Sequence, residues 1–118
     1  MKKILVFSAL IVLSACGTAK KSTDATVETI DGMSQADVDR GIQKFPGLTL
    51  NDLVEGKKLY ENNCGLCHAL KKPESESEAE WRKVVPPMVQ KANKKNGGVL
   101  DAVAEEKILR YVVTMSSK

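Results

Sequence analysis

The chain is poor in the features that would mark a large, strongly basic or membrane-spanning protein. Its 118 residues leave room for one small domain. The longest apolar run, residues 4–13, is interrupted only by Ser8 and is too short to cross a membrane as a helix. The 18 Lys and Arg residues against 15 Asp and Glu residues give a net charge of only +3, whereas a nucleic-acid-binding protein would need a strong basic excess.

Cysteine and histidine are scarce, and most of them stand together. The only histidine, His68, directly follows the second of two cysteines in the stretch CGLCH at residues 64–68. A zinc site would need a fourth ligand, and past Cys16 the chain has no other cysteine or histidine to offer. A thioredoxin-like Cys-x-x-Cys would need a βαβ surround, and a plain disulfide between Cys64 and Cys67 would leave His68 without a role.

The N-terminus has the layout of an export signal. Lys2 and Lys3 precede the apolar run and small residues follow it, which predicts a signal peptide over residues 1–15. The stretch LSAC at 13–16 resembles the lipobox of bacterial lipoproteins, which implies that Cys16 is lipidated and begins the mature chain. The alternative is an ordinary signal peptide that happens to contain a cysteine. Two or more acyl chains hold a protein firmly on a bilayer without spanning it.

Residues 16–33 are rich in Thr, Ser, Gly and Asp and are predicted to be a flexible tether. We therefore expect an exported protein, lipid-anchored on the periplasmic side of a bacterial membrane. The sequence leaves open whether that is the inner or the outer membrane.

The remaining residues, 34–118, are predicted to form one all-α domain. Capping residues at Ser34, Thr49, Ser77 and Asp101 predict four helices, the first ending near Phe45, and no segment alternates convincingly as a strand. The third and fourth helices carry apolar stripes, formed by Trp81, Val84, Val85 and Met88 and by Ile108, Tyr111, Val112 and Met115. Pro86 and Pro87 are expected to break or restart the third helix before Met88.

The pattern Cys-x-x-Cys-His is typical of c-type haem attachment. The thiols of Cys64 and Cys67 can both add to the vinyl groups of one porphyrin, and His68 is then placed as the proximal iron ligand. With the motif, residues 50–118 resemble a small monohaem cytochrome c of class I. The resemblance implies a small helical fold around one covalent haem, with Gly56 permitting close approach of the helices before and after the motif and Tyr111 packing there. The predicted helix at 34–45 lies outside the resemblance and has no assigned role.

The sixth iron ligand must come from another residue type, because His68 is the only histidine. Methionine is the usual alternative, and the mature chain offers Met33, Met88 and Met115. Met33 falls in the predicted tether, and Met115 has the spacing of a core residue. Met88 follows two prolines, where a rigid turn can present its thioether to the iron, and is the predicted ligand; the alternative is that it is only a core residue of its stripe.

With His68 and Met88 both on the iron, no position remains for a substrate. We therefore expect a one-electron carrier, not an enzyme, that exchanges electrons with redox proteins such as a respiratory complex or an oxidoreductase. The alternative is a haem c enzyme subunit, or a gas or redox sensor, with an open or labile sixth site. Lysines flank the motif and could steer an acidic partner, although solvated helix faces explain them more simply. Donor, acceptor, reduction potential and oligomeric state are left open.

Overall fold

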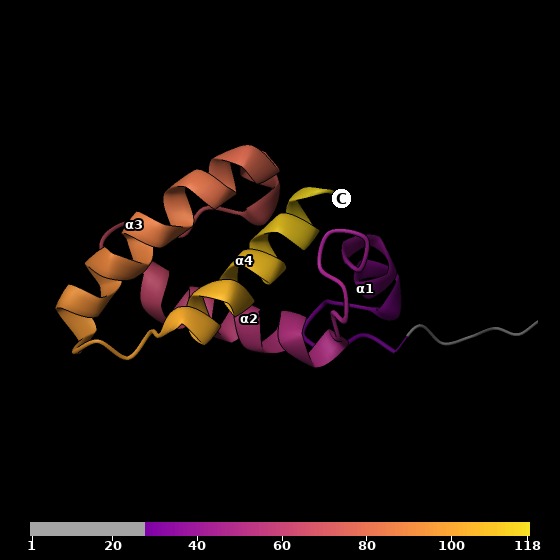
Figure 1. Ribbon diagram of the computed structural model, residues 1–118, viewed down its shortest axis with the longest axis horizontal. Helices are drawn as coiled ribbons and strands as arrows, with labels where there is room; N and C mark the ends of the chain where they lie inside the picture. The colour runs from indigo at the N-terminus through magenta and orange to yellow at the C-terminus, as the bar shows by residue number, and fades with distance from the viewer. Residues whose placement is uncertain (1–27) are drawn as a thin grey trace, which may run out of the picture.

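The computed structural model of the chain describes residues 28–118. This part folds as a compact all-α globule without strands, and the predicted all-α class is confirmed (Figure 1). Its elements are α1 (Gln35–Gly41), α2 (Leu50–Cys64), the short 3-10 helix η1 (Pro73–Ser75), α3 (Glu78–Asn96) and α4 (Ala102–Ser116). No helix among these is long and apolar enough to cross a membrane. The predicted signal peptide and Cys16 lie outside the described residues.

Each α-helix begins where its capping residue predicts. The side chains of Thr49, Ser77 and Asp101 accept hydrogen bonds from the backbone N–H three residues further on. At Ser34 the cap works through Asp37, whose carboxylate accepts from both the backbone N–H and the hydroxyl of Ser34. These bonds satisfy N–H groups that a helix start leaves without an intrahelical partner.

The most extensive contact joins α2 to α4, and Gly56 makes it possible. A Cβ atom at this position would lie 2.2 Å from the backbone oxygen of Lys107 and 2.8 Å from the Cβ of Tyr111. Only a glycine lets the two backbones come this close. The expectation that Gly56 permits the approach of these helices, with Tyr111 packed at the crossing, is confirmed.

Helix α3 packs against α4 through a buried apolar stripe that extends one turn further than predicted. Trp81, Val85, Val89 and Ala92 are buried, whereas Val84 and Met88 are half-buried beside the core. The expected break at Pro86 and Pro87 is wrong, because α3 runs through both prolines. The carbonyls that lose their donors lie four residues earlier, on exposed residues of α3, where water can donate to them instead.

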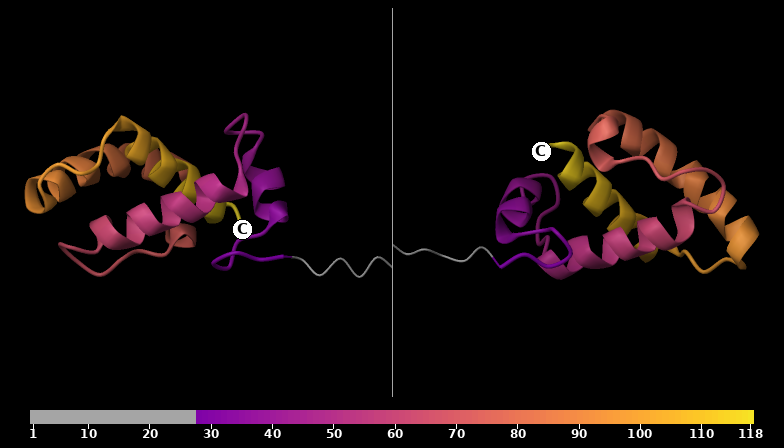
Figure 2. Two further views of the ribbon diagram at one scale, coloured as in Figure 1. Left: turned by 90° about the horizontal axis from the view of Figure 1, so that it is seen from below. Right: turned by 180° about the vertical axis from the view of Figure 1, so that it is seen from behind.

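Helix α1 packs against α4 and, less extensively, against α2 (Figure 2). The turns that follow α1 reach the start of α3, where Lys44 pairs with Glu78 and Arg82 lies over the ring of Phe45. The prediction of a tether as far as Met33 is wrong at its end: Met33 is 1% exposed and belongs to the core. A tight turn brings it there, since Ile30 and Met33 exchange backbone hydrogen bonds around Asp31 and Gly32, both with positive φ. Helix α1 is shorter than predicted, ending at Gly41, and turns lead on to the buried Phe45.

Candidate functional site

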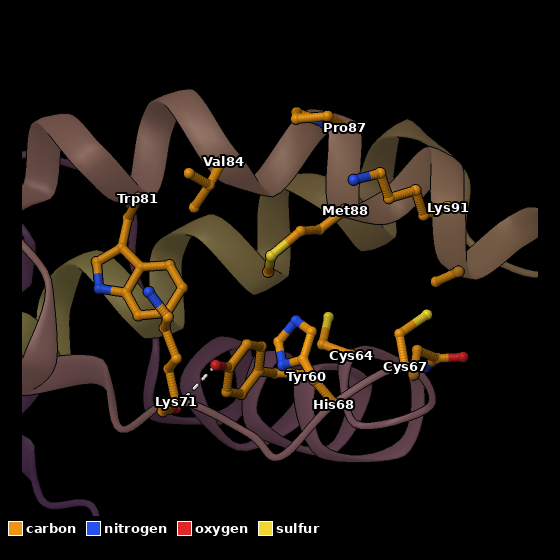
Figure 3. A pocket seen from close by; sticks show the side chains of 12 residues that line it. Tyr60, Cys64, Cys67, His68, Lys71, Trp81, Val84, Pro87, Met88 and Lys91 are labelled. Carbon is orange, nitrogen blue, oxygen red and sulfur yellow. Dashed lines mark hydrogen bonds between the residues drawn. The ribbon is translucent and has the colours of Figure 1, made fainter.

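A cleft of about 380 Å³ opens between α3 and the end of α2 with the loop that follows it (Figure 3). This volume falls in the range of roughly 300–1,000 Å³ that is usual for cofactor and small-molecule sites. The walls are largely apolar. The lining residues are Tyr60, Asn63, Cys64, Cys67, His68, Lys71, Trp81, Val84, Pro87, Met88, Lys91 and Ala92. The cleft thus brings together all four residues that the sequence predicts to hold haem and iron.

The lower wall in Figure 3 carries the CGLCH motif. Cys64 is the last residue of α2 and is buried, whereas Cys67 and His68 follow the helix end and are exposed. The two thiols are not joined to each other. Burial, with Cys67 nearby, raises the pKa of Cys64 to about 11, so its thiol is protonated at neutral pH. Both cysteines line one cleft, and neither is engaged in a disulfide.

The imidazole of His68 has a defined tautomer. Its Nδ1 lies 2.8 Å from the carbonyl oxygen of Ala69. Because a carbonyl only accepts, Nδ1 must carry the proton and donate it. In the neutral ring the lone pair is then on Nε2, and this is the form of histidine that binds a metal, with its second nitrogen hydrogen-bonded to the backbone.

Met88 comes from the opposite wall. Figure 3 shows its side chain descending from α3 toward the wall that carries Tyr60, Cys64 and His68. The helix, and not the expected rigid turn after the prolines, presents this thioether. Met33 and Met115 are buried in the core and do not line the cleft. Of the three methionines considered, Met88 alone shares the cleft with His68.

Two further side chains in the cleft hold the loop after the motif, a role that no sequence pattern indicates. The hydroxyl of Tyr60 donates to the carbonyl of Lys71 at 2.8 Å, and the indole N–H of Trp81 donates to the carbonyl of Pro73 at 2.8 Å. The rings of Tyr60 and Trp81 meet edge to face, with their centroids 5.9 Å apart. Burial, with Cys64 and Tyr111 nearby, raises the pKa of Tyr60 to about 12, so its hydroxyl keeps the proton that it donates.

At the other end of the cleft, an amide pair joins α3 to α2. The side-chain nitrogen of Asn96 donates to the side-chain oxygen of Asn63 at 2.6 Å. Asn93, one turn earlier in α3, bonds both backbone groups of Leu100 and so fixes the loop into α4. The wall that carries Met88 is therefore anchored near both of its ends, by Trp81 and by Asn96.

Few of the lysines that flank the motif in sequence reach the cleft. Lys71 and Lys91 line it, and Lys71 is paired with Glu76. Two of the others pair with acidic residues on their own helix, Lys57 with Glu61 and Lys83 with Glu80. Such ion pairs are common on solvated helix faces. The structure therefore adds no specific support to the hypothesis that these lysines form a docking surface for an acidic partner.

Comparisons with known protein families, with curated proteins and with solved structures found no match to this chain. Function therefore has to be inferred from the site itself.

Proposed function

We propose that this protein is a lipid-anchored monohaem c-type cytochrome that carries single electrons between redox partners outside the cytoplasm. In this proposal Cys64 and Cys67 hold the haem covalently, and His68 and Met88 are its axial ligands. The observation that carries the proposal is the composition of the cleft, in which two thiols and an imidazole on one wall face a thioether on the other.

The residues present fit the group. Thiols at this spacing are suited to thioether formation, and the lone pair of His68 lies on the nitrogen that its backbone hydrogen bond leaves free. Largely apolar walls, with Trp81 and Val84 beside Met88, suit a flat hydrophobic ring. When bound, haem would supply reversible one-electron exchange, whose potential a methionine ligand raises.

The chain's own residues would set orientation and access. Cys64, at the fixed end of α2, and Cys67, in the loop, would determine which edge of the ring enters the cleft. Met88 would occupy the position that a substrate or gas needs, which favours an electron carrier. A haem c enzyme subunit or a sensor would need that position open or labile, and the test below separates these functions.

The covalent link is tested first. Purified full-length protein extracted with acidified acetone should keep its haem, because thioether bonds survive this treatment. Haem that passes into the organic phase would contradict the proposal at its base.

The axial ligand is tested next. The ferric wild-type protein should be low-spin, with the weak near-red band of methionine-to-iron coordination, and its ferrous form should resist carbon monoxide. Met88→Ala should lose the band, lower the potential and admit carbon monoxide, because the thioether favours ferrous iron and fills the sixth position.

Met115→Ala is the matched control, since it removes a methionine that lies outside the cleft. It should leave the band and the carbon monoxide response unchanged. Wild-type protein that is high-spin, or that binds carbon monoxide at once, would favour the enzyme or sensor.

A further inference from the structure

The loop that carries His68 has unusual backbone bonding. Outside the helices, residues 67–71 take part in no backbone–backbone hydrogen bond, and the next such bond is from Ser75 N–H to the carbonyl of Lys72. A connection of this kind would ordinarily be among the most mobile parts of a small domain. Its position therefore depends on whichever side chains bind it.

Two of those side chains belong to the cleft wall. Tyr60, from α2, binds the carbonyl of Lys71, and Trp81, from α3, binds the carbonyl of Pro73, both at 2.8 Å. Figure 3 shows the Tyr60 hydroxyl directed at Lys71 across the base of the cleft. Both rings are themselves immobilised: Trp81 is 0% exposed and Tyr60 is 3% exposed. Each side chain is thus held by packing and presents one polar group to the loop.

The held segment begins two residues after the acceptor of His68. Nδ1 of His68 donates to the carbonyl of Ala69, two residues before the carbonyl that Tyr60 binds. The strength of that imidazole bond depends on how steadily the Ala69 carbonyl is held. A hydrogen bond at Nδ1 raises the electron donation of Nε2 to a bound metal and fixes the plane of the ring.

We propose that Tyr60 and Trp81 are positioning residues that clamp the loop after the haem motif and so set the hydrogen bond, orientation and ligand strength of His68. This inference rests on the proposed function and deepens it. Tyr60 acts through the backbone of Lys71 and Ala69, and its hydroxyl adds a role to the packing role of its ring. The carbonyl that it binds lies eleven residues away, so the contact closes the loop onto α2.

The test compares two tyrosines that differ in this one respect. Tyr60→Phe keeps the ring, with its contacts to Trp81 and Tyr111, and removes only the clamp. Tyr111→Phe is the matched control, because Tyr111 is also buried at the same crossing but its hydroxyl makes no hydrogen bond within the described residues 28–118. Both variants are made in the full chain and purified with haem.

Two readouts are followed, and neither should respond to a small loss of stability alone. In the NMR spectrum the Nδ1 proton of His68 should exchange with D₂O about fivefold faster in Tyr60→Phe, the factor that corresponds to one net hydrogen bond. The reduction potential should rise, because weaker donation from the imidazole stabilises ferric iron less. Tyr111→Phe should match the wild type in both.

Unchanged exchange and potential in Tyr60→Phe would overturn the clamp and leave the proposed function standing. Equal shifts in both variants would also overturn it, since they would show a general packing effect. If the wild-type protein carries no covalent haem, the proposed function fails separately. The clamp is then decided by amide exchange of residues 69–73, which should be faster in Tyr60→Phe than in Tyr111→Phe and would overturn the clamp if equal.

Discussion

Replacing Gly56 by alanine should destabilise the fold by disturbing the crossing of α2 and α4. The new Cβ would lie 2.2 Å from the Lys107 carbonyl oxygen, about 1 Å short of ordinary van der Waals contact. The atom it meets is backbone inside α4, so no side-chain rotation can relieve the overlap. The Cβ of Tyr111, at 2.8 Å, is also fixed to that backbone. The helices must therefore move apart along their most extensive contact.

The change in the free energy of unfolding is the balance of two opposing effects. Overpacking a core typically costs about 1–3 kcal/mol, and the rigid neighbours here place Gly56→Ala near the upper end. Fully buried residues at the helix contacts, such as Leu53, Ile108 and Val112, lose dispersion energy when a gap opens. Alanine is favoured over glycine within a helix by about 1 kcal/mol, which offsets part of the loss. We expect a net destabilisation of about 2 kcal/mol.

Urea unfolding of the haem-loaded protein measures this change. With a slope of about 2 kcal/mol per molar urea for a domain of this size, the midpoint should fall by about 1 M. Gly65→Ala is the matched control: its nearest neighbour would be the flexible Leu70 side chain at 3.3 Å, and its φ of −80° suits any residue. A midpoint for Gly56→Ala within the error of the wild type would refute the reasoning.

Two further predictions concern residues in the N-terminal third of the sequence. Cys16→Ala should move the protein from the membrane to the soluble fraction without changing its haem spectrum, and continued membrane association would contradict the lipid anchor. Burial acts to raise the pKa of Asp37, but hydrogen bonds from Ser34 and Arg40 outweigh it and hold the pKa below its usual value. Asp37→Asn should therefore cost about 1 kcal/mol at neutral pH. Because the contribution of a depressed carboxyl is complete above its unfolded pKa and disappears as pH falls through the folded one, the difference from wild type should shrink below about pH 4. A difference that is constant across that range in paired denaturation curves would show that the charge is not involved.

Much of the fold could be predicted because its signals are local. The caps at Ser34, Thr49, Ser77 and Asp101 each act over one helical turn, and the four helices begin there. The close approach of the helices at Gly56 is implied by the resemblance to small monohaem cytochromes c, and no local signal in the sequence indicates it. The CGLCH residues, by contrast, could be singled out as a candidate site, since their chemistry lies within five consecutive positions.

The errors occurred where distant contacts decide the structure. The break expected at Pro86 and Pro87 follows from local hydrogen bonding, yet packing of Val85 and Val89 on α4 holds α3 together through them. Met33 stands in a polar stretch that resembles a linker, and only the core formed by later helices gives its side chain a place. No pattern in the sequence reveals that Tyr60 binds the carbonyl of Lys71, because a backbone acceptor has no residue type.

These observations show that the two walls of the cleft are held in different ways. The wall with Cys64 is the end of α2, whose other face is locked to α4 at Gly56, so it shares the rigidity of the core. The wall with Met88 is α3, which is tied across the cleft mainly through Trp81 to Pro73 and through Asn96 to Asn63. A change at the α2–α4 crossing should therefore act first on stability. A change at the Asn96–Asn63 tie should act first on the position of Met88, and so on the potential and on access to the iron. Trp81 is also a fully buried core residue, so a change there should act on stability as well. Measuring stability and reduction potential in one variant at the α2–α4 crossing and one variant at the Asn96–Asn63 tie of α3 would separate the residues that stabilise the fold from those that position the iron ligands.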